Sequence, residues 1–160
     1  MSLDEPVDGA AILREHGLRV TAQRLAVLRG VAARPHSTAD DIDKYVQEKI
    51  GAISRQAVYD ALGVLTERGV LRRIEPAGSS ARYETRVDDD HHHLICRTCG
   101  TVVDIGSEAV TTPLLSAADG HGFTIHETEV TYWGSCPDCQ AAAHLRVDDT
   151  IDSTSPTIAP

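Results

Sequence analysis

Apolar residues recur at helical spacing through the first half of the chain. Val58, Leu62 and Leu65 stand at positions i, i+4 and i+7, so they share one face of a helix. Thr21 and Ser54 are hydroxyl residues placed to cap the helices that follow them. The pattern predicts four helices, at residues 10–16, 22–33, 39–49 and 55–68.

The helical pattern gives way to a hairpin pattern after Gly69. Residues 70–74 and 81–85 have strand character and flank the turn-rich residues 76–80. Helices followed by a two-stranded hairpin are typical of a winged helix, which is a helix-turn-helix with a hairpin appended. We therefore expect a DNA-binding domain over residues 1–87.

The second half shows strand periodicity instead. Strands are expected on both sides of a turn at Cys96–Gly100, with a helix at residues 108–119 and a long strand at 123–133. The fold class is α+β, with two domains. We expect a hinge at residues 88–90, a small metal-binding α/β domain at 91–145 and a disordered tail at 146–160.

Charge divides the chain at the same place. Residues 1–87 carry 13 Lys or Arg and 12 Asp or Glu, whereas residues 88–160 carry 2 and 12, which together give the net charge of −9. The basic residues needed for DNA thus lie almost entirely in the first half. The acidic N-terminus lacks a secretory signal, and no apolar run is long enough for a membrane helix, so a cytoplasmic protein with no membrane contact is expected.

The four cysteines form two Cys-x-x-Cys pairs, Cys96 with Cys99 and Cys136 with Cys139. Four thiolates in a tetrahedral array suit zinc and leave no open position, which predicts a structural site. A redox dithiol is the competing interpretation, but such a motif usually occurs once, next to a thioredoxin-like βαβ unit.

A histidine triplet, His91-His92-His93, precedes the first cysteine pair. In a strand His91 and His93 would share a face, and two imidazoles on one face suit a divalent transition metal. A solvated polar run at a hinge explains the triplet equally well from composition alone. His36 is a lone histidine that follows Pro35, and the residues do not decide whether it is solvated or a ligand.

Six motifs taken together resemble the ferric uptake regulator (Fur) family over residues 10–140. They are Leu18-Arg19-Val20-Thr21-x-x-Arg24, His36-Ser37-Thr38-Ala39-Asp40-Asp41, Ala57-Val58-Tyr59, Ala81-Arg82-Tyr83-Glu84, His91-His92-His93-Leu94-Ile95-Cys96-x-x-Cys99-Gly100 and Tyr132-Trp133-Gly134-x-Cys136-x-x-Cys139. The resemblance implies a homodimer that binds double-stranded operator DNA, with an N-terminal winged helix and a C-terminal dimerisation domain. Residues 54–60 and 132–134 are similar to the actinobacterial branch encoded beside catalase-peroxidase genes.

The resemblance also implies a regulatory Fe(II) or Mn(II) site, separate from the structural Zn(II). Its ligands would be His36, Glu84, His91, His93 and Asp104. The ligand set leaves two signals open, peroxide and iron. An aspartate at position 104 resembles the peroxide-sensing branch of the family, whereas a glutamate at position 84 resembles the iron-sensing branch. In the peroxide branch, peroxide reacts at bound Fe(II) and oxidises a ligand histidine, for which His36 and His91 are the candidates.

Two further sets of residues follow from the resemblance. A third metal site would use Asp90, His92, Glu108 and His126, although Thr128 stands where a histidine would be expected. DNA would be contacted by Arg19, Arg55, Gln56 and Tyr59, with Asp60 in place of a neutral or basic residue.

The function expected is a metal-dependent repressor of oxidative-stress or iron-homeostasis genes. The nearest alternative is a regulator of iron or zinc supply that does not sense peroxide. A zinc hydrolase that uses the histidines and Glu84 is the alternative from another class, but no residues suggest a pocket for a small-molecule substrate. A regulator, and not an enzyme, is therefore the prediction.

Overall fold

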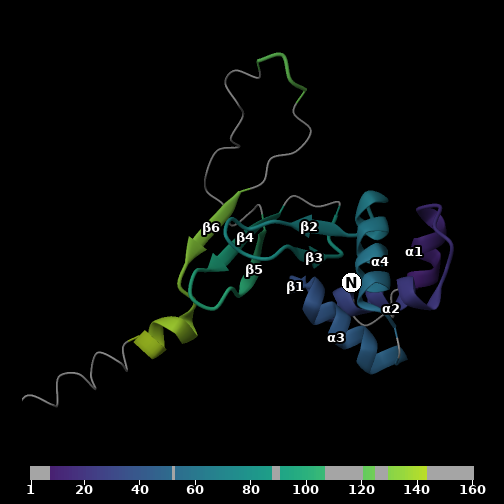
Figure 1. The fold of residues 1–160 in the computed structure, drawn as a ribbon. Helices are drawn as coiled ribbons and strands as arrows, with labels where there is room; N and C mark the ends of the chain where they lie inside the picture. Colours follow the sequence, from purple (N-terminus) through teal and green to yellow (C-terminus); the bar gives the residue numbers. More distant parts are fainter. Residues whose placement is uncertain (1–7, 52, 88–90, 107–120, 125–129, 144–160) are drawn as a thin grey trace, which may run out of the picture. The chain divides into compact units, whose positions relative to one another are not determined.

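The computed structural model describes residues 8–51, 53–87, 91–106, 121–124 and 130–143. These residues divide between two compact units, Met1–Asp89 and Asp90–Pro160. The first unit is mainly helical and the second contains a separate sheet (Figure 1).

Four helices and a small sheet make up the first unit. The elements are α1 (Gly9–Glu15), α2 (Ala22–Ala33), β1 (Ser37–Thr38), α3 (Ala39–Ile50), α4 (Arg55–Glu67), β2 (Arg72–Ile74) and β3 (Arg82–Glu84). The three strands form an antiparallel sheet in the order β1-β3-β2. The predicted winged helix is confirmed, with β2 and β3 as the wing.

Side-chain caps begin the helices where the sequence predicts. The Thr21 side chain accepts a hydrogen bond from the Arg24 N–H, and the Ser54 side chain accepts one from the Ala57 N–H. These bonds satisfy backbone donors that have no partner inside the helix. At its C-terminal end, α3 stops after Ile50, because Gly51 adopts a φ of 75°.

The core of the first unit lies where α2, α3 and α4 meet. Val58, Leu62 and Leu65 of α4 are fully buried, as the helical spacing predicts. They pack with apolar residues of the other helices, namely Leu13, Val27, Val31, Ile42 and Val46. Burying one such leucine contributes about 1.5–3 kcal/mol, so this cluster fixes the position of α4.

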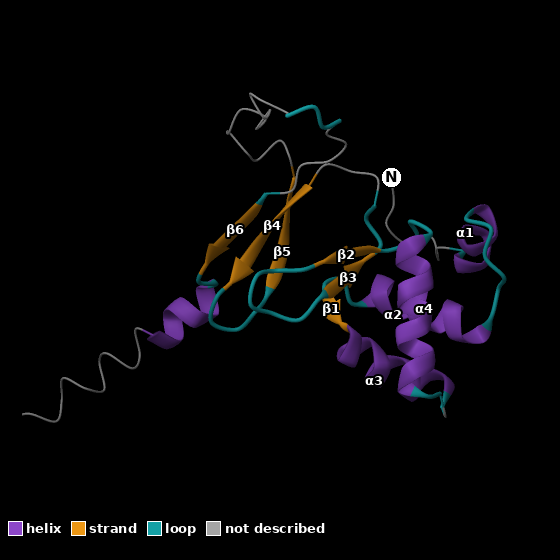
Figure 2. Ribbon diagram, turned by 45° about the horizontal axis from the view of Figure 1, so that its top comes forward, coloured by secondary structure: helices purple, strands orange, loops and turns teal. Residues whose placement is uncertain are grey.

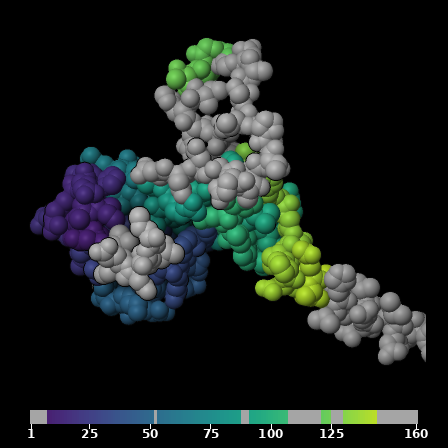
Figure 3. Space-filling model, turned by 180° about the vertical axis from the view of Figure 1, so that it is seen from behind, coloured from purple at the N-terminus to yellow at the C-terminus, as the bar shows by residue number. Residues whose placement is uncertain are grey.

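The second unit contains a three-stranded mixed sheet. Its strands are β4 (His91–Cys96), β5 (Val102–Gly106) and β6 (Thr131–Gly134), in the order β5-β4-β6 (Figure 2). β5 runs antiparallel to β4, and β6 runs parallel to it. Residues 137–143 are helical and are yellow in the space-filling view, in which α1 is purple (Figure 3).

One prediction about secondary structure is wrong, and two elements were not predicted. The long strand predicted at 123–133 is too long, because Phe123 and Thr124 lie outside any strand and β6 begins at Thr131. The short strand β1 and the helix at 137–143 were not predicted. The predicted helix at 108–119 and tail at 146–160 lie outside the described residues.

Candidate functional site

The structure brings the four cysteines together in the second unit. Cys96 ends β4, Cys99 lies in the turn before β5, and Cys136 and Cys139 follow β6. Their sulfur atoms all lie within 4.8 Å of one another, and the Cys99 and Cys136 sulfurs are 3.6 Å apart. In a tetrahedral site with Zn–S bonds of about 2.3 Å, sulfurs are about 3.8 Å apart. The cluster therefore fits a zinc ion.

The environment of the cluster favours some thiolates and disfavours another. Backbone N–H groups, that of Cys99 foremost and then that of Cys136 at 3.3 Å, lower the pKa of Cys96 to about 5. A hydrogen bond with Thr101 lowers the pKa of Cys99. Hydrogen bonding to the neighbouring Cys136 raises the pKa of Cys139 to about 12. A bound cation is therefore needed to keep all four adjacent thiols in the thiolate form.

A second set of donors occurs in the first unit, where His36 meets Glu84. The His36 Nε2 atom lies 3.0 Å from Glu84 Oε2, and the Glu84 side chain is 1% exposed. The Arg72 Nε atom lies 3.9 Å from the other carboxylate oxygen. A buried carboxylate beside an imidazole offers one oxygen and one nitrogen donor to a divalent cation.

The histidine triplet supplies a further set of donors in the second unit. His91 and His93 are both buried and lie on one face of β4, with their ring centroids 4.8 Å apart. Asp104 stands opposite His93 in the β4–β5 register. One of its carboxylate oxygens lies 3.8 Å from His91 Nε2 and 3.7 Å from His93 Nε2. Strand alternation directs His92 to the other face.

The exposed face of α4 carries the residues predicted to contact DNA. Arg55, Gln56 and Tyr59 are exposed and stand at positions i, i+1 and i+4, and Asp60, which is not among the predicted contacts, is exposed beside them. The buried stripe of Val58, Leu62 and Leu65 lies on a different face of the same helix. Arg19, also exposed, precedes α2. An exposed helix face next to a wing is the arrangement by which winged helices enter the major groove.

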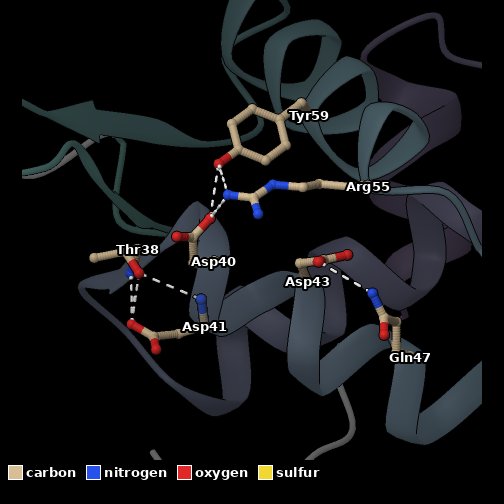
Figure 4. A network of polar contacts seen from close by, with 7 residues as sticks. All are labelled: Thr38, Asp40, Asp41, Asp43, Gln47, Arg55 and Tyr59. Carbon is tan, nitrogen blue, oxygen red and sulfur yellow. Dashed lines mark hydrogen bonds and ion pairs between the residues drawn. The ribbon is translucent and has the colours of Figure 1, made fainter.

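A network of polar contacts ties this face to α3 (Figure 4). Asp40, in the first turn of α3, accepts hydrogen bonds from Arg55 and from the Tyr59 hydroxyl, the latter at 2.9 Å. Arg55 Nη2 also donates to the Tyr59 oxygen at 3.2 Å. Farther along α4, Gln56 donates to Asp60 at 2.7 Å.

The sequence matches a known family over most of its length. The model of the ferric uptake regulator family matches residues 15–133. The chain belongs to the ferric uptake regulator family. As a family member, the protein is a transcriptional regulator.

Its relatives in the family include regulators with different names. The transcriptional regulator FurA of Mycobacterium tuberculosis is 49% identical over 132 residues, which are 82% of this chain and 90% of that protein. The peroxide operon regulator of Bacillus subtilis is 33% identical over 140 residues, 87% of this chain and 96% of that protein. The crystal structure of the Vibrio cholerae ferric uptake regulator shares the fold, with a TM-score of 0.67 and 23% identity over 81% of this chain and all of that one.

Some predicted site residues of this family member cannot be placed. Asp90, Glu108 and His126, predicted for a third metal site, lie outside the described residues. Conversely, the hydrogen bond from Tyr59 to Asp40 was not predicted, because it joins α4 to α3 across a sequence separation of 19 residues. In the part of the chain that the structure describes, no helix is long and apolar enough to cross a membrane.

Proposed function

We propose that this protein is a metal-dependent repressor that binds operator DNA as a homodimer, with a structural zinc ion and a regulatory Fe(II) or Mn(II) ion. One observation carries the proposal. β4 directs His91 and His93 to one face and Cys96 to the other. A single strand therefore serves two donor sets of different chemistry, one of thiolates and one of imidazoles and carboxylate.

The two donor sets suit different metals and different roles. Thiolates favour zinc and fill its four positions, so the cysteine cluster would hold the second unit together. Imidazole and carboxylate donors suit Fe(II) and Mn(II), which they bind more weakly and release more easily. The regulatory ligands in this proposal are His36 and Glu84 from the first unit with His91, His93 and Asp104 from the second.

The regulatory ion would act on DNA binding through the units themselves. An ion that takes ligands from both units restricts their relative motion, so the metal-bound dimer presents its two α4 helices at a fixed spacing. Tyr59, Arg55 and Gln56 would then reach base edges, and Arg19 the neighbouring backbone or minor groove. Arginine contacts with phosphate would make the affinity depend strongly on salt.

Fluorescence anisotropy on DNA from the protein's own upstream region tests this function. The apo, Mn(II) and Fe(II) forms of the zinc-loaded protein are compared at one salt concentration. We expect tight binding only with a regulatory metal. His93→Ala should remain a folded dimer and lose the response to metal, whereas Leu94→Ala, at an exposed position on the other face of β4, should keep it. Binding of His93→Ala equal to that of metal-bound wild type would refute the site.

Peroxide is the input that we propose for the Fe(II) form. A relative 33% identical is named a peroxide operon regulator, and the donor set places two buried imidazoles beside one carboxylate. Micromolar peroxide should release the Fe(II) protein from DNA and leave the Mn(II) protein bound. A peptide that contains His36 or His91 should gain one oxygen atom. If both metal forms stay on DNA, the protein regulates by metal supply alone.

A further inference from the structure

The backbone of His36 is held in an unusual conformation by its neighbours. Its φ is 61°, in the left-handed region that residues other than glycine rarely adopt. The His36 N–H donates to the Tyr83 carbonyl at 2.9 Å, and the His36 carbonyl accepts from Arg82 Nη1 at 2.8 Å. Because both backbone groups are bonded, the imidazole cannot move far without moving the chain that follows it.

The chain that follows His36 passes into α3 without a loop. β1 consists of Ser37 and Thr38, which pair with Tyr83 and Arg82 of β3. Thr38 is also the cap of α3, and its side chain exchanges hydrogen bonds with Asp41 in a capping box. The first turn of α3 therefore moves with β1 as one piece.

Asp40 lies in that first turn, and its side chain reaches α4. Its carboxylate accepts hydrogen bonds from Tyr59 and Arg55, so two side chains of the DNA-reading face are placed by it (Figure 4). The side chains of Arg55 and Asp40 are 62% and 55% exposed. An ion pair so exposed contributes little to stability. Its main effect is on where the two reading side chains point.

We propose that Asp40 couples metal binding at His36 to the placement of Tyr59 and Arg55. The inference rests on the proposed function, since it needs a regulatory metal at His36. Metal at His36 and Glu84 fixes β1, β1 fixes the first turn of α3, and Asp40 holds the two side chains in position to meet base edges. Without metal, the His36 side chain loses this restraint, and Asp40 holds the two side chains less firmly. This coupling acts inside the first unit, in addition to any effect on how the two units are arranged.

The coupling is measured as a ratio of operator affinities, with and without saturating Mn(II), on the zinc-loaded full-length protein. Allosteric ratios of about 5-fold to 150-fold are usual. We expect Asp40→Ala to reduce the wild-type ratio by about twofold to fivefold, which is the range for the loss of exposed contacts with a charged group. Asp60→Ala is the matched control. It also removes a carboxylate from the exposed face of α4, but that carboxylate accepts its hydrogen bond from Gln56 of the same helix.

The ratio of affinities with and without Mn(II) distinguishes coupling through Asp40, which we call the relay, from a simple effect of charge on DNA affinity. Removing a negative charge near DNA raises affinity with and without metal alike, so the ratio of Asp60→Ala should stay at the wild-type value. By reciprocity, the operator should also increase the Mn(II) affinity of Asp40→Ala less than that of the wild type, by the same factor. A role confined to the stability of α3 would not change either ratio.

Each other outcome overturns a defined claim. A wild-type ratio in Asp40→Ala means that metal acts without Asp40, which refutes the relay and leaves the proposed function intact. Equal losses in Asp40→Ala and Asp60→Ala mean that surface charge, not the relay, sets the ratio. If Mn(II) does not change the operator affinity of the wild-type protein, the proposed function and the relay are both refuted. If Asp40→Ala melts well below the wild type, Asp40→Ser replaces it, because serine keeps a polar side chain in the first turn of α3 but is too short to reach Tyr59 and Arg55.

Discussion

Replacing Cys96 by serine should weaken zinc binding and loosen the second unit alone. Structural zinc sites contribute about 10–16 kcal/mol in small peptides, so each of four thiolates accounts for about 3–4 kcal/mol. The zinc dissociation constant should therefore rise by roughly 100-fold to 1000-fold. Cys96 is 5% exposed at the end of β4 and accepts a hydrogen bond from the Cys136 N–H. The serine variant should thus bind zinc more weakly and weaken the hydrogen-bonded link between β4 and the segment after β6.

The loss should appear as a smaller stability of the sheet. With zinc in excess, a zinc affinity that is 100-fold to 1000-fold weaker stabilises the folded unit by about 3–4 kcal/mol less. Most domains are stable by only about 5–15 kcal/mol. β6 has four residues and pairs only with β4 among the described strands, so it should separate first. The first unit contains no cysteine and should keep its melting transition.

Competition with a chromogenic zinc chelator measures the affinity, and tryptophan fluorescence follows the sheet. Trp133 is the single tryptophan of the chain. It pairs with Ile95 in the β4–β6 register, and its ring lies 4.9 Å from the Arg97 guanidinium carbon. Ser135→Ala, an exposed change next to Cys136, is the control. Zinc affinity within tenfold of the wild type, with unchanged fluorescence, would show that Cys96 is not a ligand.

Three further predictions concern the core, the α3 cap and the protons of the cysteine cluster. Leu62→Ala should lower the free energy of unfolding of the first unit by about 2–5 kcal/mol in urea titrations, because Leu62 is fully buried; a loss below 1 kcal/mol would contradict the assigned core. Thr38→Ala should cost about 1 kcal/mol by removing the cap, whereas Thr38→Ser should cost much less, and equal losses would count against the capping box. Zinc binding at pH 7 should release protons, since the pKa of Cys139 is about 12 and its proton must leave, while Cys96, with a pKa of about 5, is already ionised. Zinc affinity should therefore fall as the pH falls, and calorimetry in two buffers with different ionisation heats counts the protons; a count of zero would refute this assignment.

The helices of the first unit were predictable because the signals for them are local. Thr21 and Ser54 cap α2 and α4 through residues three positions away, so the sequence near each start already contains the cause. The same holds for the cysteine pairs, whose spacing alone predicts that two thiolates of a pair face one cation.

The elements that escaped prediction depend on distant partners. β1 has only two residues, and it is a strand because Tyr83 and Arg82 lie beside it. The β-branched residues from Thr124 onward suggest a strand, but the strand among the described residues is the part that pairs with β4. The helix at 137–143 begins at Pro137, and proline is common at the first position of a helix, where its missing N–H has no consequence.

The candidate sites divide in the same way. Alternation along one strand predicts that His91 and His93 share a face, and the structure places them so. The link between Asp40 and Tyr59 joins two helices and has no local signal. Residues that act through a contact between elements are therefore the ones that a single sequence does not reveal.

The parallel pairing of β4 with β6 affects the order in which the chain folds. The first unit consists mostly of helices with local contacts, which form quickly. The second sheet must wait, because His93 pairs with Thr131 and the chain between them has to be synthesised first. Until Cys136 and Cys139 emerge from the ribosome, Cys96 and Cys99 can offer zinc only half a site. In newly made protein the first unit should therefore be folded before the sheet of the second unit is complete. The supply of zinc during synthesis should then set the fraction of chains in which the second unit folds.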